Sequence, residues 1–148
     1  MLKLARQQIL LGQSVATKAD AIALLAGKLT DAGLVEAGYV DGMLAREAQH
    51  ATYLGSGIAI PHGRAPTLDR PRGALLRLAT PVDFGGEEPV DLVFAMAVPA
   101  HYTHQHLMLL SELAELFSAP DIRQALREAG DARALREALD MTPPASAA

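Results

Sequence analysis

A histidine between a proline and a glycine is the residue of this sequence whose surroundings best suit chemistry. His62 follows Pro61 and precedes Gly63, just past a short apolar run. The proline fixes its own φ angle and biases the residue before it to extended geometry. The glycine has no side chain, so another molecule can approach the imidazole closely. Because a neutral imidazole is a good nucleophile near pH 7, we consider His62 a candidate nucleophile. The alternative is a turn histidine that only forms a backbone hydrogen bond.

A second histidine and an arginine could bind an anion held at His62. His106 lies in the first turn of a predicted helix, where free N–H groups and a partial positive charge favour anions. Arg46 ends another predicted helix, and its guanidinium could bind a phosphoryl group through a forked pair of hydrogen bonds. The alternatives are a half-buried histidine at the edge of a core face and a solvated helix-face charge, with Glu47 on the same face as Arg46.

The spacing of His101, His104 and His106 leaves a zinc or nickel site open as an alternative. However, two residues that are two apart on a helix point in different directions. The chain has no cysteine, which excludes disulfides, thiolate metal sites and cysteine nucleophiles. Nucleotide-binding loops and the nucleophile elbow of serine hydrolases are also absent. We therefore expect neither a metal nor another cofactor.

Composition excludes several classes of partner. The 148 residues carry a net charge of −4 without a run of five like charges, which argues against nucleic acid and against a polybasic membrane helix. The longest strongly apolar run, residues 92–98, is far too short to span a membrane. The first eleven residues are too short for a signal peptide. These features predict a cytoplasmic protein with no membrane insertion.

The helices and strands that would position these residues can be predicted from hydrophobic periodicity and from the residues that typically begin or end such elements. Thr17 is a candidate N-cap and Gly33 a candidate C-terminal stop for a first helix, and a second helix is predicted over 36–48. Three further helices are predicted at 104–118, 120–129 and 131–140. Strands are predicted at 52–54, 58–60, 73–79 and 90–98. Loops are predicted at 64–72 and 81–89. This order predicts an α/β or α+β fold: one domain over residues 1–140, followed by a disordered tail over 141–148.

Four segments together resemble a known family. They are Leu44-Ala-Arg-Glu, Thr52-Tyr-Leu-Gly-Ser-Gly-Ile-Ala-Ile-Pro-His-Gly, Pro89-Val-Asp-Leu-Val-Phe-Ala-Met-Ala-Val-Pro and His106-Leu-Met-Leu-Leu-Ser-Glu-Leu-Ala. In this order they resemble the enzyme IIA proteins of the bacterial phosphoenolpyruvate-dependent sugar phosphotransferase system, fructose/mannitol class, which includes the nitrogen-regulatory IIA proteins. The resemblance covers roughly residues 4–139. It implies a mixed β-sheet sandwiched between helices.

The resemblance also implies roles for the candidate residues. His62 would accept phosphate, through Nε2, from the carrier HPr or from its nitrogen-branch relative. His106 would be the second active-site histidine, and Arg46 would lie near the phosphoryl group. We expect Leu54, Ile60 and the start of the helix that carries His106 to border the partner surface.

Two downstream roles stay open. In the first, the phosphate passes to a IIB component for fructose/mannitol-type sugar uptake. In the second, the phosphorylation state of His62 controls binding to regulatory partners, as in a nitrogen-regulatory IIA protein. Residues 33–47 look more like the sugar-transport branch, whereas the lack of attached transport segments favours the regulatory branch.

Overall fold

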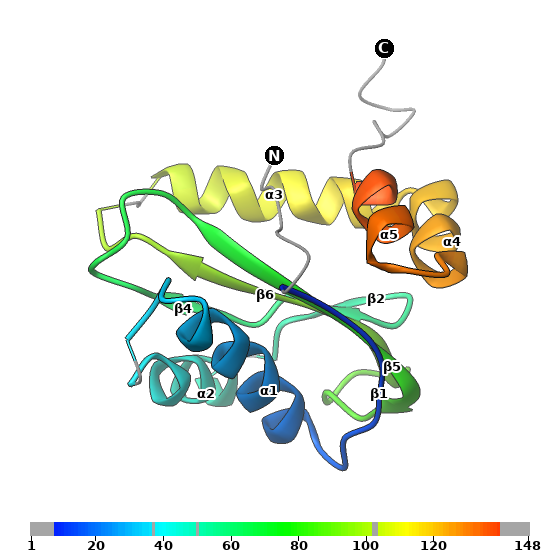
Figure 1. Ribbon diagram of the computed structural model, residues 1–148, viewed down its shortest axis with the longest axis horizontal. Coiled ribbons are helices and arrows are strands. Elements are labelled where there is room, and N and C mark those ends of the chain that lie inside the picture. Colours follow the sequence, from blue (N-terminus) through cyan, green and yellow to red (C-terminus); the bar gives the residue numbers. More distant parts are fainter. Residues whose placement is uncertain (1–7, 37, 50, 102–103, 140–148) are drawn as a thin grey trace. The chain divides into compact units, whose positions relative to one another are not determined.

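The computed structural model describes residues 8–36, 38–49, 51–101 and 104–139. Two compact units are present, one ending at His101 and the other beginning at Tyr102. The first unit contains the strands and two helices, and the second contains helices (Figure 1). The predicted tail over 141–148 lies outside the described residues. None of the described helices is both long and apolar enough to cross a membrane.

A mixed six-stranded sheet forms the centre of the first unit (Figure 1). Its main path runs β1-β5-β6-β3-β2, and β4 also pairs with β6. The β1–β5, β3–β6 and β4–β6 pairs are parallel, whereas β5–β6 and β2–β3 are antiparallel. The strands are β1 (Ile9–Gln13), β2 (Tyr53–Gly55), β3 (Ile58–Ala59), β4 (His62–Arg64), β5 (Arg72–Val82) and β6 (Val90–Val98).

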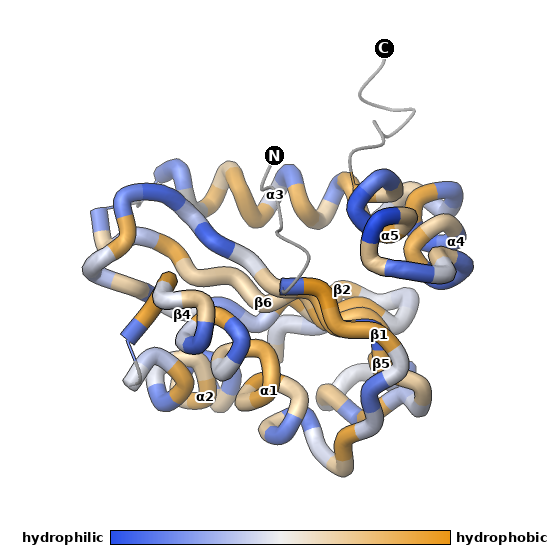
Figure 2. Tube along the Cα trace, in the orientation of Figure 1, coloured by the Kyte–Doolittle hydropathy of each residue, from blue (hydrophilic) through white to orange (hydrophobic). Residues whose placement is uncertain are grey.

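Strand β6 is the centre of the sheet, as its apolar sequence predicts. It pairs with β5 on one side and with β3 and β4 on the other. Every residue of β6 except Asp91 is buried, and the tube coloured by hydropathy is hydrophobic over most of this strand (Figure 2). A strand flanked on both edges and buried along its length is expected to be a continuous hydrophobic run. The prediction of a central strand over 90–98 is therefore confirmed.

Two helices pack against this sheet: α1 (Lys18–Asp31) and α2 (Tyr39–Gln49). Thr17 caps α1 by accepting a hydrogen bond from the backbone N–H of Asp20, and Gly33 follows the helix with φ +73°, so both predicted end signals are confirmed. Helix α1 contacts β5 and β6, and α2 contacts β4. Their apolar faces share one core with residues of the sheet, including Ile22, Leu25, Leu29, Met43, Leu76, Phe84 and Val93.

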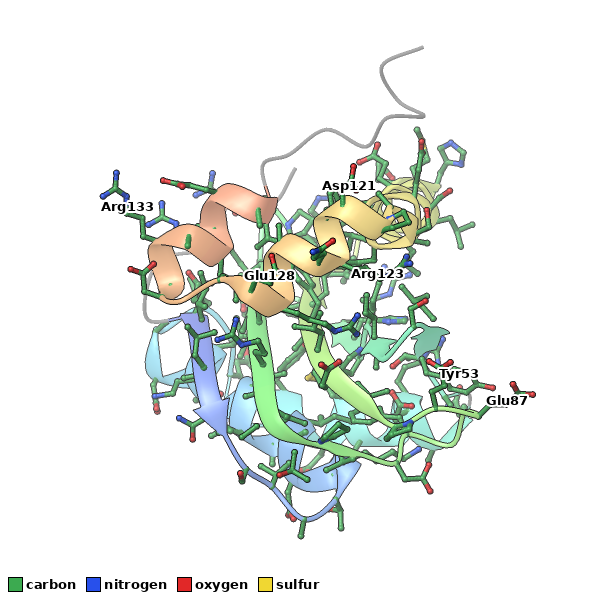
Figure 3. All side chains as sticks on the ribbon, turned by 90° about the vertical axis from the view of Figure 1, so that its right-hand side faces the viewer. Tyr53, Glu87, Asp121, Arg123, Glu128 and Arg133 are labelled. Carbon is green, nitrogen blue, oxygen red and sulfur yellow. The ribbon has the colours of Figure 1, made fainter. Side chains whose placement is uncertain are left out.

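The second unit contains α3 (His104–Ser118), α4 (Pro120–Glu128) and α5 (Ala132–Leu139). Helix α4 packs against both α3 and α5. Pro120 opens α4, where its missing N–H costs nothing, and Asp131 accepts a hydrogen bond from the backbone N–H of Ala134 at the start of α5. Charged side chains cover the outer faces of these two helices, among them Asp121, Glu128 and Arg133 (Figure 3).

Helix α2 begins at Tyr39, three residues after the predicted start, and the strands differ from the sequence-based expectation mainly at three places. Strand β1 (Ile9–Gln13) lies in a segment that carries no strong strand signal of its own. Strand β5 continues to Val82, beyond the predicted end at Ala79, and its pairing with β6 is irregular between Arg77 and Val82. His62 follows the short strand β3, as predicted, but it also begins a short strand of its own, β4.

Candidate functional site

The backbone of β4 holds His62 beside the central strand. His62 pairs with Met96 of β6, and the Met96 N–H donates to the Pro61 carbonyl at 2.9 Å. The imidazole Nδ1 lies 2.9 Å from the carbonyl oxygen of Ile60. A carbonyl oxygen can only accept, so Nδ1 carries the proton and donates. In the neutral ring the lone pair is therefore on Nε2, the nitrogen that a nucleophile at this position would use.

The surroundings of His62 favour the neutral ring. Burial lowers its pKa, and the hydrogen bond to Ile60 opposes this shift. The positive charges of Arg46 and Arg64 lower the pKa further, while the negative charge of Glu47 raises it. The residue is only 6% exposed. Because the pKa is held below its ordinary value, the ring stays unprotonated at pH 7 and keeps its lone pair.

Gly63 faces helix α2. A Cβ built at this position would lie 3.3 Å from the Cγ of Met43 and 3.3 Å from the Cε1 of Tyr39. The Tyr39 hydroxyl donates to the Met96 carbonyl at 2.6 Å, and burial raises the pKa of that hydroxyl, so it stays a donor. The expectation that Gly63 opens the imidazole to another molecule is therefore wrong. The glycine is needed because α2 packs directly on the backbone of β4.

Packing of α2 on β4 brings two charged side chains into the electrostatic environment of His62. Arg46 lies in the last turn of α2, and its charge acts on the imidazole. The next residue, Glu47, is buried, with only 4% of its surface exposed. The expectation that Glu47 belongs to a solvated helix face is wrong, because its carboxylate has specific partners inside the protein.

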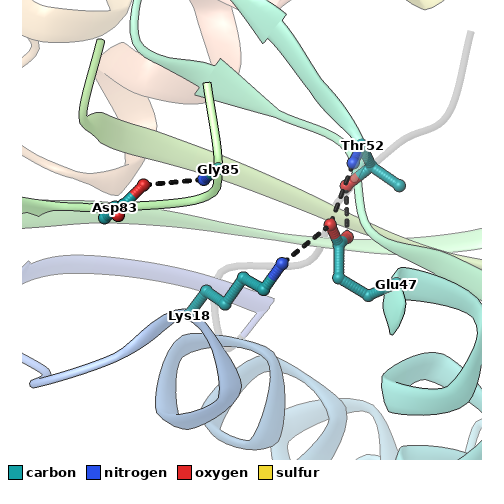
Figure 4. Close-up of polar contacts among 5 residues, drawn as sticks. All are labelled: Lys18, Glu47, Thr52, Asp83 and Gly85. Atoms are coloured by element: carbon teal, nitrogen blue, oxygen red, sulfur yellow. Dashed lines mark hydrogen bonds and ion pairs between the residues drawn. The ribbon is translucent and has the colours of Figure 1, made fainter. Parts of the chain in front are cut away.

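The Glu47 carboxylate joins three segments (Figure 4). The hydroxyl of Thr52 donates to Oε1 at 2.6 Å, and the backbone N–H of Thr52 donates to Oε2 at 2.9 Å. The ammonium of Lys18, at the start of α1, lies 3.7 Å from Oε2. All three partners are donors or cations, so they suit a carboxylate.

Arg64 is a cation near His62 that the sequence reasoning did not single out. Its Nη1 donates to the carbonyls of Pro99 at 3.2 Å and of Ala100 at 3.5 Å. A sequence signal was available: residues two apart on a strand point to the same face, and Arg64 is two residues after His62. Arg64 also lines a surface pocket together with Tyr39.

The backbone of His106 lies in the first turn of α3, as predicted, but its side chain lies outside the described residues. Exposed histidines at His101 and His104 lie beside it in sequence. Within the described ranges, no three histidine or carboxylate side chains are grouped as a metal would require. The role implied for His106 therefore stays a prediction. The alternative of a metal site at His101, His104 and His106 is not tested, because the His106 side chain lies outside the described residues.

The exposed fractions of the apolar side chains show which of the residues predicted to border a partner surface lie at the surface of the protein. Leu54 is 44% exposed, and Leu107 at the start of α3 is 67% exposed. Ile60 is only 2% exposed, so the expectation that it borders a partner surface is wrong. Tyr53, beside Leu54, lies close to Glu87 at the rim of a surface pocket (Figure 3). Exposure of β2 leaves an apolar area on the surface that a partner can cover.

Comparison with known proteins relates this arrangement to a family. Residues 3–141 match the family described as "Phosphoenolpyruvate-dependent sugar phosphotransferase system, EIIA 2". A multiphosphoryl transfer protein of Vibrio cholerae is 43% identical over 136 residues, which cover 90% of this chain and 33% of that protein. A nitrogen regulatory protein of Bradyrhizobium diazoefficiens is 37% identical over 147 residues, covering 97% of this chain and 95% of that protein. The chain thus spans about a third of the first relative and nearly all of the second.

Solved structures show the same fold. The nitrogen regulatory protein IIA-Ntr from Neisseria meningitidis has a TM-score of 0.83 and 34% identity, covering 91% of this chain and 94% of that chain. Enzyme IIA for mannitol from Escherichia coli, solved in complex with phosphorylated enzyme IIB for mannitol, has a TM-score of 0.81 and 29% identity, covering 94% of this chain and 98% of that chain. The predicted fold class, a mixed sheet with helices, is confirmed. This chain belongs to the EIIA 2 family of the phosphoenolpyruvate-dependent sugar phosphotransferase system.

Proposed function

We propose that this protein is a cytoplasmic phosphocarrier that accepts a phosphoryl group on Nε2 of His62 and passes it to a second protein. One observation carries the proposal: the 2.9 Å contact between Nδ1 and the Ile60 carbonyl places the proton of a neutral imidazole on Nδ1 and the lone pair on Nε2. Membership in the phosphotransferase family supports the reaction class.

In the proposed reaction, the donor is a phosphohistidine on HPr or on a nitrogen-branch HPr-like carrier. The lone pair of Nε2 attacks phosphorus, a new P–N bond forms, and the P–N bond of the donor breaks with its electron pair returning to the donor imidazole. No water, metal or cofactor enters this balance. Transfer of this kind depends on in-line positioning and on neutralising the charge of the phosphoryl oxygens.

The charges around His62 fit that requirement. Arg46 and Arg64 disfavour an imidazolium, and for the same electrostatic reason they favour a bound phosphoryl dianion. We assign Arg46 to phosphoryl binding, as the family resemblance implies. We assign His106 to assistance of the transfer from phospho-His62, because its place in the first turn of α3 lies where a helix favours anions.

The acceptor is proposed to be a IIB component of a fructose/mannitol-type uptake system. A related IIA protein for mannitol has been solved in complex with its phosphorylated IIB partner, which supports an acceptor of this kind. The alternative is a regulatory role in which the phosphorylation state of His62 controls binding to regulatory proteins. Similarity over 97% of this chain to a nitrogen regulatory protein favours that alternative.

The test is to incubate the purified protein with phosphoenolpyruvate, enzyme I and HPr, and to map any acid-labile phosphate by mass spectrometry. We expect one phosphate, on His62. His62→Ala should abolish labelling, His106→Ala should permit labelling but slow onward transfer to IIB, and the exposed control His101→Ala should behave as the parent protein. Labelling with the nitrogen-branch carrier alone would favour the regulatory role. No labelling with either carrier would refute the proposal.

A further inference from the structure

The buried carboxylate of Glu47 lies one residue after the proposed phosphoryl-binding arginine. It has three partners, from the start of α1 and from the segment that leads into β2. Burying a charge is costly unless the charge is paired and hydrogen-bonded, so such a group is expected to have a definite role. A neutral or apolar residue could fill this position in the last turn of α2 without the cost of burying a charge.

Contacts with Thr52 fix how α2 connects to the segment that carries His62. Two hydrogen bonds from one residue, at 2.6 and 2.9 Å, hold Thr52 against the last turn of the helix. The carbonyl of Thr52 in turn accepts from the backbone N–H of Ile60 at 3.0 Å, and the carbonyl of Ile60 accepts from the imidazole of His62. A continuous chain of hydrogen bonds therefore runs from Glu47 to His62.

Glu47 also supplies a charge of opposite sign to the cations near His62. The charged groups that act on the imidazole are Arg46 and Glu47 from α2 and Arg64 from β4, while Lys18 from α1 pairs with Glu47. Without Glu47 the site would carry two guanidinium charges with no nearby compensation among these groups. Excess positive charge makes a phosphoryl group easier to bind but harder to pass on.

We propose that Glu47 is a positioning residue for phosphoryl transfer, which orients His62 through Thr52 and Ile60 and moderates the positive charge around the imidazole. This inference depends on the proposed function of His62. It assigns to Glu47 a task in the reaction, in addition to its structural contacts with Thr52 and Lys18.

The Glu47→Gln variant separates charge from contact. A glutamine carbonyl can still accept from the Thr52 N–H, and its amide can donate to the Thr52 hydroxyl oxygen, while the negative charge is lost. The matched control is Asp41→Asn, which removes an exposed carboxylate from the first turn of the same helix. Both variants differ from the parent protein by one charge, so a change confined to Glu47→Gln is specific to its position.

Two measurements are made on the three proteins: the pKa of His62, by NMR titration of its ring nitrogens, and the rate at which phosphorylated His62 passes its phosphoryl group on to IIB. We expect Glu47→Gln to lower the pKa of His62 and to slow phosphoryl passage on to IIB by about tenfold, because the uncompensated positive charge holds the phosphoryl group more tightly. Asp41→Asn should change neither. If the parent protein is phosphorylated on His62 and Glu47→Gln matches Asp41→Asn in both measurements, the inference is wrong while the proposed function stands.

Thr52→Val tests the contact by itself, and remains informative if Glu47→Gln does not fold. It removes the 2.6 Å hydrogen bond with little change of volume and leaves the Glu47 charge in place. We expect slower transfer with the pKa of His62 close to that of the parent protein. Thr52→Ser, which keeps the hydroxyl, should restore the rate. Parent-like transfer in Thr52→Val would exclude a positioning role for this contact.

Discussion

The close packing of Gly63 on helix α2 predicts that Gly63→Ala destabilises the protein. The added Cβ would lie 3.3 Å from a side-chain carbon of Met43 and 3.3 Å from one of Tyr39, and 3.5 Å from the Met43 backbone nitrogen. Favourable carbon contacts begin at about 3.5 Å, so these atoms must move by a few tenths of an ångström. Met43 is fully buried, and Tyr39 is held by its hydrogen bond to the Met96 carbonyl, so neither yields freely.

Overpacking of this kind costs about 1–3 kcal/mol. For a chain of this length, each kcal/mol lowers the midpoint of thermal unfolding by about 2–4 °C, so a cost near the middle of that range gives a decrease of about 4–8 °C. Urea denaturation monitored by circular dichroism measures the free energy directly, and a thermal scan measures the midpoint. An unchanged slope of free energy against urea would show that the native fold is retained.

The matched control is Gly42→Ala in α2. A Cβ at Gly42 meets nothing within 4 Å, and the residue lies inside the helix, where alanine is favoured over glycine by about 0.5–1 kcal/mol. The same chemical change should therefore stabilise the protein at position 42 and destabilise it at position 63. Equal or greater stability of Gly63→Ala than of the parent protein would refute the reasoning, because it would mean that α2 is not tightly packed on β4.

Two further predictions follow from the same region. Tyr39→Phe removes the 2.6 Å hydrogen bond and leaves the Met96 carbonyl without that donor, so urea denaturation should show a loss of about 1–3 kcal/mol, and a parent-like value would show that water replaces the hydroxyl. The pKa of His62 is lower in the folded protein than in the unfolded chain, where a histidine has a pKa of about 6.5. As the pH falls from about 6.5 towards the lower pKa of the folded protein, the imidazole of His62 takes up a proton in the unfolded chain before it does so in the folded protein. Stability should therefore decline over that window in the parent protein. The stability of the His62→Gln variant should decline less over the same window. Identical plots of stability against pH for the two proteins would contradict the argument that burial lowers the pKa of His62.

Local signals in the sequence were sufficient for most of the elements around the site. The Thr17 cap, the glycine stop at Gly33 and the apolar run of β6 each act through neighbouring residues, so they can be recognised without the fold. Strand β1 was missed because its stability comes from parallel pairing with β5, more than 60 residues away, and from the buried bond between Gln8 and the Gly73 carbonyl. Pairing over that distance leaves no local pattern.

The surroundings of the site were harder to predict than its central histidine. Glu47 continues the helical spacing of Val40 and Met43, which face the core, so its position indicated burial even though its charge suggested solvent. The two hydrogen bonds donated by Thr52 offset the cost of burying the Glu47 charge, and no helical pattern in the sequence reveals them. The close approach of α2 to Gly63 was likewise invisible, because a glycine required by packing cannot be distinguished in sequence from one required by access.

The mixed sheet also has a consequence for how the protein folds. Strands β5 and β6 are joined through residues 83–89 alone, whereas β1 reaches β5 only by closing a loop of about 65 residues. Loop-closure entropy makes the second pairing about 2 kcal/mol more costly than the first. We therefore expect the antiparallel β5–β6 pair to form first during folding and β1 to join it later. Substitutions within β5 and β6 should slow folding, whereas those in β1 should mainly speed unfolding.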